Sequence, residues 1–363
     1  MMEEHFYISD EKLKLWLALL KCPQFGVVSF LRLKALLPEP TDVFALPATE
    51  LIHYGLTEPQ IAYFRRPDWQ YIERLMAWMH SHRVLLVPYG SPHYPELLAS
   101  TARPPVALFV KGQLNLLQRP QIAFVGSRNP SHYGKQVTQY LIQQLASTQV
   151  CITSGLAIGI DGLAHKAALQ SDCPTIAVLG SGFQHLYPKR HVRLADEIAE
   201  NGLLITEFLP DVPPIQHNFP RRNRIIAGLT NGTVVVEAAI KSGSLITAQF
   251  SLEEGRDVFA VPGNIFNPLS AGTHHLIQQG AKLISSAADI VEDYLSMPVS
   301  QSVTKNHLAG SKLLASVDHD TTPVDVIVQR SNLPVDQVLT ELLDLEVQGA
   351  VAAVPGGYIK VAT

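Results

Sequence analysis

The pattern of apolar and polar positions divides the chain into a helical amino-terminal part and a longer part with a different rhythm. Apolar residues recur at roughly helical spacing from Leu13 to Leu20, and prolines interrupt the later apolar segments up to about residue 80. A connector rich in proline follows, from Pro88 to Pro105. We therefore expect residues 1–84 to form a small all-α domain.

From Gln121 onward, short apolar runs alternate with amphipathic segments of helical period. The apolar runs predict strands at residues 122–125, 150–153, 175–179, 203–206, 233–237, 258–261 and 282–284. The segments between them predict helices such as 135–146, 163–169, 194–200 and 245–254. Strands that are apolar throughout and separated by helices are typical of a mostly parallel sheet covered on both faces. We predict an α/β fold with a doubly wound sheet over residues 85–295, because the strands number one fewer than a (β/α)₈ barrel needs.

The carboxyl-terminal part has a third pattern. Residues 296–311 are polar and without periodicity, which fits a flexible linker. Residues 323–329 and 334–345 predict two helices, and Gly356 and Gly357 predict a hairpin after them, an order that resembles a small winged helix over residues 312–363. Its candidate recognition helix, 335–346, carries acidic side chains and no basic one, so we expect it to contact protein, or no partner, in preference to DNA.

Composition and charge narrow the classes of function. The chain has 363 residues, of which 47% are hydrophobic and 17% charged, as in globular proteins. The formal net charge is −4, and the residues from Lys312 onward account for all of it. Any nucleic-acid site must therefore be a local basic patch. The three cysteines have no paired spacing, which argues against a disulfide framework or a zinc site. The acidic amino terminus and short apolar runs favour a cytoplasmic protein without a membrane span.

Candidate binding residues follow the predicted strands, where ligands bind in open α/β sheets. Small or basic residues follow five of these strands, one group after each: Ser127 and Arg128; Gly155; Lys189; Arg221, Arg222, Asn223 and Arg224; Gly243 and Ser244. The group from Arg221 to Arg224 lies at the end of an extended segment. A single phosphate needs one such loop, whereas several along one edge suit a ligand with phosphates in a row. Tyr187 and Phe219, beside the basic residues, could stack on unpaired bases.

Other polar residues have ordinary structural explanations. Asp161 and His165 lie four apart at a helix start, but no nucleophile accompanies them, so we expect a helix cap and a packed histidine. Glu207 and Glu237 lie at strand ends, where carboxylates often cap the next loop. We expect no catalytic residue and no metal ligand.

The motifs GSR, SGxAxGID, YP, NFPRRNRIIAGL, VVVEA, SGSLITA and VFAVPG, in this order, resemble the DNA-processing protein A (DprA, or Smf) family over roughly residues 85–295. The resemblance implies an extended Rossmann-like sheet between a sterile-alpha-motif-like domain and a winged helix. It also implies a protein without a cofactor that binds single-stranded DNA, protects incoming DNA in natural transformation and helps to load the RecA recombinase. His191 departs from the commoner asparagine at its position.

By the same resemblance, the DNA-binding residues are Ser127, Arg128, Lys189, Arg221, Arg222, Asn223 and Arg224, with Gly155, Gly243 and Ser244 shaping the backbone. His274 and Leu283 look like anchors of the family's homodimer surface.

Two other functions remain as alternatives. A nucleotide phosphoribohydrolase of the lysine-decarboxylase-like family would share the fold, but its PGGxGTxxE loop is absent and the first acidic residue after Gly243 is Glu253. A protein-binding scaffold would leave the basic loops unexplained.

Overall fold

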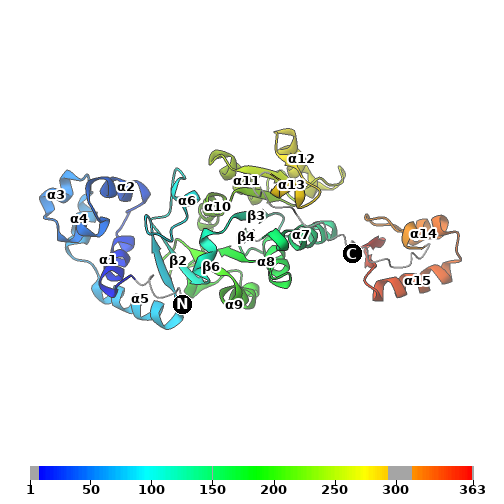
Figure 1. The fold of residues 1–363 in the computed structure, drawn as a ribbon, viewed down its shortest axis with the longest axis horizontal. Helices are drawn as coiled ribbons and strands as arrows, with labels where there is room; N and C mark the ends of the chain where they lie inside the picture. Colours follow the sequence, from blue (N-terminus) through cyan, green and yellow to red (C-terminus); the bar gives the residue numbers. More distant parts are fainter. Residues whose placement is uncertain (1–7, 149, 293–312, 362–363) are drawn as a thin grey trace.

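The computed structural model describes residues 8–148, 150–292 and 313–361. Five helices open the described chain: α1 (Asp10–Lys21), α2 (Val27–Leu36), α3 (Ala48–His53), α4 (Glu58–Arg65) and α5 (Trp69–His82). The side chain of Ser9 caps α1 by accepting a hydrogen bond from the Lys12 amide, and Asp68 caps α5 in the same way through Tyr71. The predicted all-α amino-terminal domain is present (Figure 1).

A nine-stranded sheet follows, in the order β1-β2-β6-β5-β4-β3-β7-β8-β9. The strands from β3 onward are parallel and correspond to the predicted ones. They are β3 (Gln121–Val125), β4 (Cys151–Ser154), β5 (Thr175–Val178), β6 (Leu203–Thr206), β7 (Gly232–Val235), β8 (Asp257–Ala260) and β9 (Lys282–Leu283). The order reverses between β3 and β7, as in a doubly wound sheet.

Two strands and one helix differ from the sequence prediction. The proline-rich connector contains β1 (Leu85–Pro88) and β2 (Ala107–Gly112), which pair with each other and with β6 in antiparallel fashion. The last residues of the extended segment expected to end at Arg224, from Asn218 onward, instead form the first half of helix α10 (Asn218–Leu229). Pro220 lies in the first turn of α10, where its missing amide hydrogen costs no intrahelical bond.

Helices cover both faces of the sheet. On one face lie α7 (His132–Leu145), α8 (Ile160–Gln170) and α9 (Val192–Asn201), with the short α13 (Ala288–Val291) beside α7. On the other lie α6 (Glu96–Ala99), α10, α11 (Gly243–Glu253) and α12 (Ala271–Gln278). This arrangement is the expected extended Rossmann-like fold.

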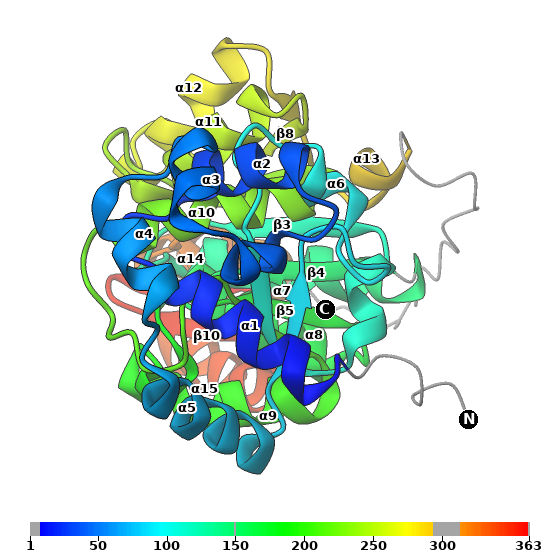
Figure 2. The ribbon, with the colours of Figure 1, turned by 90° about the vertical axis from the view of Figure 1, so that its left-hand side faces the viewer.

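The amino-terminal helices share a hydrophobic core with the sheet. Trp16 of α1 and Leu75 of α5 belong to the same buried cluster as Phe109 of β2 and Leu204 of β6. In Figure 2 these helices lie in front of the sheet. The helical domain therefore covers the β2–β6 end of one face.

The carboxyl-terminal domain has a separate small core. Helices α14 (Val324–Ser331) and α15 (Val335–Val347) pack against the hairpin of β10 (Val351–Val354) and β11 (Gly357–Lys360). This is the predicted winged-helix arrangement. The expected linker, residues 296–311, lies outside the described residues.

Candidate nucleic-acid interface

Ser127 and Arg128 follow β3, the strand at which the strand order of the sheet reverses. The Ser127 amide donates to the Glu237 carbonyl (2.7 Å), and the Ser127 carbonyl accepts from the Ile160 amide (3.1 Å). Gly159 has φ +88°, and a Cβ there would collide with the Ser127 carbonyl, so the two loops require a glycine at this approach. Arg128 is exposed above this fixed turn.

Gly155, after β4, lies against a buried arginine. The Arg222 guanidinium, 5% exposed, donates to the carbonyls of Gly155 and Val178, and a Cβ at Gly155 would collide with it. The Gly155 amide donates to the Asp161 carboxylate (3.1 Å). Burial lowers the pKa of Arg222 to about 10, an effect that the Asp161 charge opposes. Arg222 therefore holds two loops together and is not available at the surface.

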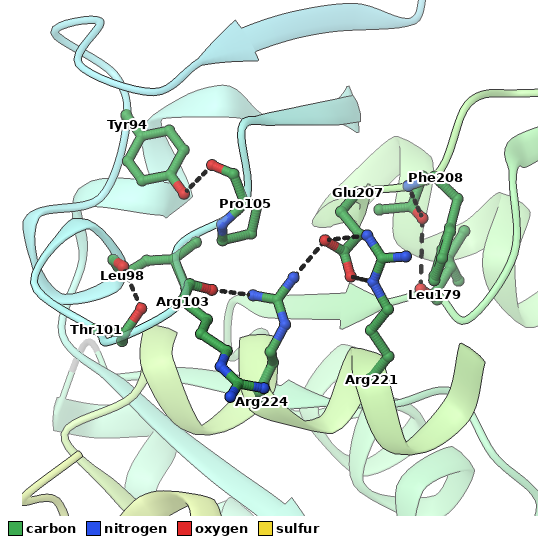
Figure 3. A network of polar contacts seen from close by, with 11 residues as sticks. Tyr94, Leu98, Thr101, Arg103, Pro105, Leu179, Glu207, Phe208, Arg221 and Arg224 are labelled. Carbon is green, nitrogen blue, oxygen red and sulfur yellow. Dashed lines mark hydrogen bonds and ion pairs between the residues drawn. The ribbon is translucent and has the colours of Figure 1, made fainter. Parts of the chain in front are cut away.

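Arg221 and Arg224, three residues apart in α10, share one carboxylate. Arg221 Nε lies 2.9 Å from Glu207 Oε1, and Arg224 donates to Glu207 Oε2 (Figure 3). The side chains of Arg221, Arg224 and Glu207 are 55%, 18% and 5% exposed. Arg221 is therefore the more accessible cation of the two.

Lys189 is exposed in the loop after β5, next to an aromatic pair. The rings of Tyr187 and Phe219 have centroids 5.6 Å apart at an angle of 50°. Tyr187 is 50% exposed. His191, the residue that departs from the resemblance, is buried, and its Nδ1 lies 2.9 Å from the Leu156 carbonyl. The histidine thus ties the loop after β5 to the loop after β4.

The first turn of α11 completes the edge. Ser242 caps this helix by accepting from the Ser244 amide (3.3 Å), and Asn223 Nδ2 lies 3.5 Å from the Gly243 carbonyl. Gly243 is exposed, and a Cβ there would meet no atom within 4 Å. A side chain at position 243 would therefore not collide with any other described residue, so packing does not explain the glycine.

The strand-end carboxylates have partners, and the buried histidine has one at Nδ1. Glu237 accepts from the Ser131 amide (2.9 Å) and from its hydroxyl, at the start of α7. His165 Nδ1 lies 2.8 Å from the Thr175 hydroxyl, and burial lowers the pKa of His165 to about 3. Asp161 lies inside the first turn of α8 and binds the Gly155 amide, so it is not the N-cap that we expected; Gly159 is.

The structure places the predicted residues along one edge, because the strands that precede them are parallel. Arg128, Lys189 and Arg221 are exposed there, whereas Ser127 and Arg222 are buried. Arg103, which the sequence pattern did not indicate, lies beside Arg224 in Figure 3. Its place depends on the direction of β2, a strand whose flanking prolines hid it.

The two predicted dimer anchors lie elsewhere, near the β9 end of the sheet. His274 Nε2 is 3.0 Å from the Gly263 carbonyl, and Leu283 is 49% exposed. Leu276, close to both in sequence, belongs to the core.

The described residues contain neither a candidate metal site nor a candidate membrane-spanning helix. No group of three or more histidine, cysteine, aspartate or glutamate side chains there could hold a metal ion. None of the helices described is both long and apolar enough to cross a membrane.

Comparison with known proteins gives consistent matches along the chain. The family model of DNA recombination-mediator protein A matches residues 85–295, the DprA winged helix domain matches 309–357, and the SMF/DprA SAM domain matches 10–77. Protein Smf of Escherichia coli is 46% identical in an alignment of 330 positions that covers 87% of this chain and 87% of that protein.

Two solved structures are similar as well. The X-ray structure of DNA processing protein A from Streptococcus pneumoniae aligns with a TM-score of 0.69 and 37% identity, over 78% of this chain and 99% of that one. The protein of the same name from Helicobacter pylori, described for its single-stranded DNA binding mode, aligns with a TM-score of 0.53 and 29% identity, over 58% of this chain and 95% of that one.

Proposed function

The chain belongs to the DNA recombination-mediator protein A (DprA/Smf) family, and on that premise we propose that it binds single-stranded DNA along the carboxyl edge of its sheet without catalysing a reaction. The observation that carries the proposal is the row of exposed cations Arg128, Lys189 and Arg221 beside the exposed Tyr187 ring. Cations attract consecutive phosphates, and an aromatic ring gives an unpaired base a surface to stack on.

The proposed site comprises Ser127, Arg128, Gly155, Lys189, Arg221, Arg222, Asn223, Arg224, Gly243 and Ser244, within a DNA-binding unit of residues 85–295. Their roles differ with burial. Exposed cations contact phosphates, and the amides at the start of α11 attract anions. Buried Arg222 and Gly155 shape the loops.

The absence of catalysis is part of the proposal. Glu207 and Glu237 are engaged by arginines and by a helix start, and His165 is fully buried. We therefore expect no release of base from nucleoside monophosphates and no cleavage of DNA.

We further propose that the protein is cytoplasmic, forms a homodimer through His274 and Leu283, and delivers bound DNA to the RecA recombinase in natural transformation. Membership of the family is what supports these partners. The exposed Leu283 supports the dimer surface, since large apolar side chains at a surface often mark a partner contact.

The test is a binding titration of the protein with single-stranded and double-stranded DNA over a range of salt concentrations. Arg128→Ala and Lys189→Ala should each weaken single-strand binding for every base sequence and lower the log–log salt slope by ~0.7 per lost phosphate contact. Arg119→Ala is the matched control, because Arg119 is exposed at the opposite edge, just before β3. Normal binding by Arg128→Ala and Lys189→Ala would show that this edge is not the site.

A further inference from the structure

Arg103 lies at the same edge of the sheet as the proposed DNA site, although it precedes its strand. β2 runs antiparallel to β6, with Phe109 opposite Thr206 and Gly112 opposite Leu203. Residues just before β2 therefore lie beside residues just after β6. This direction brings the Arg103 carbonyl next to Arg224, in the first half of α10.

The loop that carries Arg103 is held on three sides. The Tyr94 hydroxyl donates to the Pro105 carbonyl (2.8 Å), and the Ala102 amide donates to the Glu254 carboxylate (3.2 Å). The Arg103 carbonyl itself accepts from the Arg224 guanidinium. The Arg103 side chain is thus exposed on a fixed backbone, which lowers the entropy lost when a ligand binds.

The charges around Arg103 do not balance. The guanidinium groups of Arg221 and Arg224 share the Glu207 carboxylate, whereas the Arg103 side chain lies beside Arg224 and extends away from Glu207 (Figure 3). Among the described residues Arg103 has no acidic partner of its own. Neighbouring like charges repel each other, and an anion bound beside them would reduce the repulsion.

We propose that Arg103, beside Arg221 and Arg224 of the proposed site, binds a further phosphate and so extends the path of single-stranded DNA from the β3–β5 loops to β2. The inference rests on the proposed function. Arg103 is four strands away from the Arg128 loop in the sheet order, or ~19 Å at ~4.8 Å per strand. At ~3.4 Å per stacked nucleotide, this path needs ~6 nucleotides.

A path in the opposite direction is the competing possibility. It would leave the Arg128 loop across β7, where Lys241 is exposed. Arg103 and Lys241 thus mark the two directions in which a longer strand can continue, and their variants serve as controls for each other.

The experiment measures the affinity of the full chain for oligothymidylates of increasing length at low salt. Arg103→Ala should leave the shortest oligomers that bind unaffected and weaken the longer ones by about tenfold, the loss expected for one charged hydrogen bond. Its salt slope for long oligomers should fall by ~0.7. Arg103→Lys should restore the slope and most of the affinity.

Two results would overturn the inference. One is an equal loss at every length, which would mean that Arg103 acts through the proposed DNA site. The other is a length-dependent loss in Lys241→Ala but not in Arg103→Ala. The proposed function fails separately, when the unmodified protein does not bind single-stranded DNA at all.

Discussion

At the scale of single residues, Arg222 illustrates how burial changes the role of a charge. Its guanidinium satisfies the carbonyls of Gly155 and Val178 and lies near the buried Asp161 carboxylate. Burial raises the pKa of Asp161, and the Arg222 charge opposes that shift. Each charge therefore offsets the cost of burying the other.

This pairing predicts unequal effects of single and double substitutions. Arg222→Met and Asp161→Asn should each lower the free energy of unfolding; Arg222→Met, which leaves a buried charge unpaired, should cost ~3–5 kcal/mol. The double variant should lose less than the sum by at least ~1 kcal/mol. Urea unfolding measures all of these, with exposed Arg190→Met as a control expected within ~0.5 kcal/mol of the unmodified protein. Additive losses would show that the two residues are not coupled.

His165 predicts a pH dependence of stability. Burial lowers its folded-state pKa from 6.5 to about 3, so the unfolded state binds the proton more readily between these values. The free energy of unfolding should fall as the pH drops through this range, by up to ~1.4 kcal/mol per pH unit from this group. His165→Gln should remove that contribution, and exposed His185→Gln should not. Urea unfolding at several pH values tests this, and equal slopes in all three proteins would contradict it.

At the scale of elements, the apolar runs predicted every parallel strand, because buried strands have no polar face to interrupt them. β1 and β2 were not predicted, because the prolines that flank them indicate turns. The start of α10 was not predicted either, because Pro220 is typical both of a turn and of a first helical turn. The edge that carries the proposed site could be predicted from the parallel strands, because their carboxyl ends meet at one edge. The burial of Arg222 and the approach of Arg103 could not be predicted, because both depend on long-range pairing.

Leu283, in the edge strand β9, provides a test of the proposed homodimer. Leu283→Arg should leave the melting temperature nearly unchanged, because Leu283 is 49% exposed, and should shift a dimer toward monomer through repulsion between symmetry-related charges. Light scattering and a melting curve measure the two effects. Leu36→Arg, at 51% exposure in α2, is the matched control. His274→Glu is a weaker test, because His274 also holds Gly263. A Leu283→Arg protein that remains dimeric would refute this surface.

In the molecule as a whole, the described residues form two units that share no hydrophobic core, and we expect these units to unfold independently. The amino-terminal helices and the sheet share one buried cluster, whereas the winged helix has a core of its own. The Tyr71 hydroxyl also donates to Asp211 (2.9 Å), in the loop between β6 and α10. The helical domain thus supports the segment that leads to Arg221 and Arg224.

Two truncations should therefore behave differently. Removing residues 1–84 uncovers apolar side chains such as Phe109 and Leu204, each worth ~1.5–3 kcal/mol when fully buried, against a total stability of ~5–15 kcal/mol. We expect this fragment to melt well below the full chain and to bind single-stranded DNA more weakly. A chain that ends at Glu292 loses only the separate core and should keep the main melting transition. Calorimetry distinguishes the two, and a sheet that melts at the same temperature with and without the amino-terminal helices would show that the shared cluster contributes little to its stability.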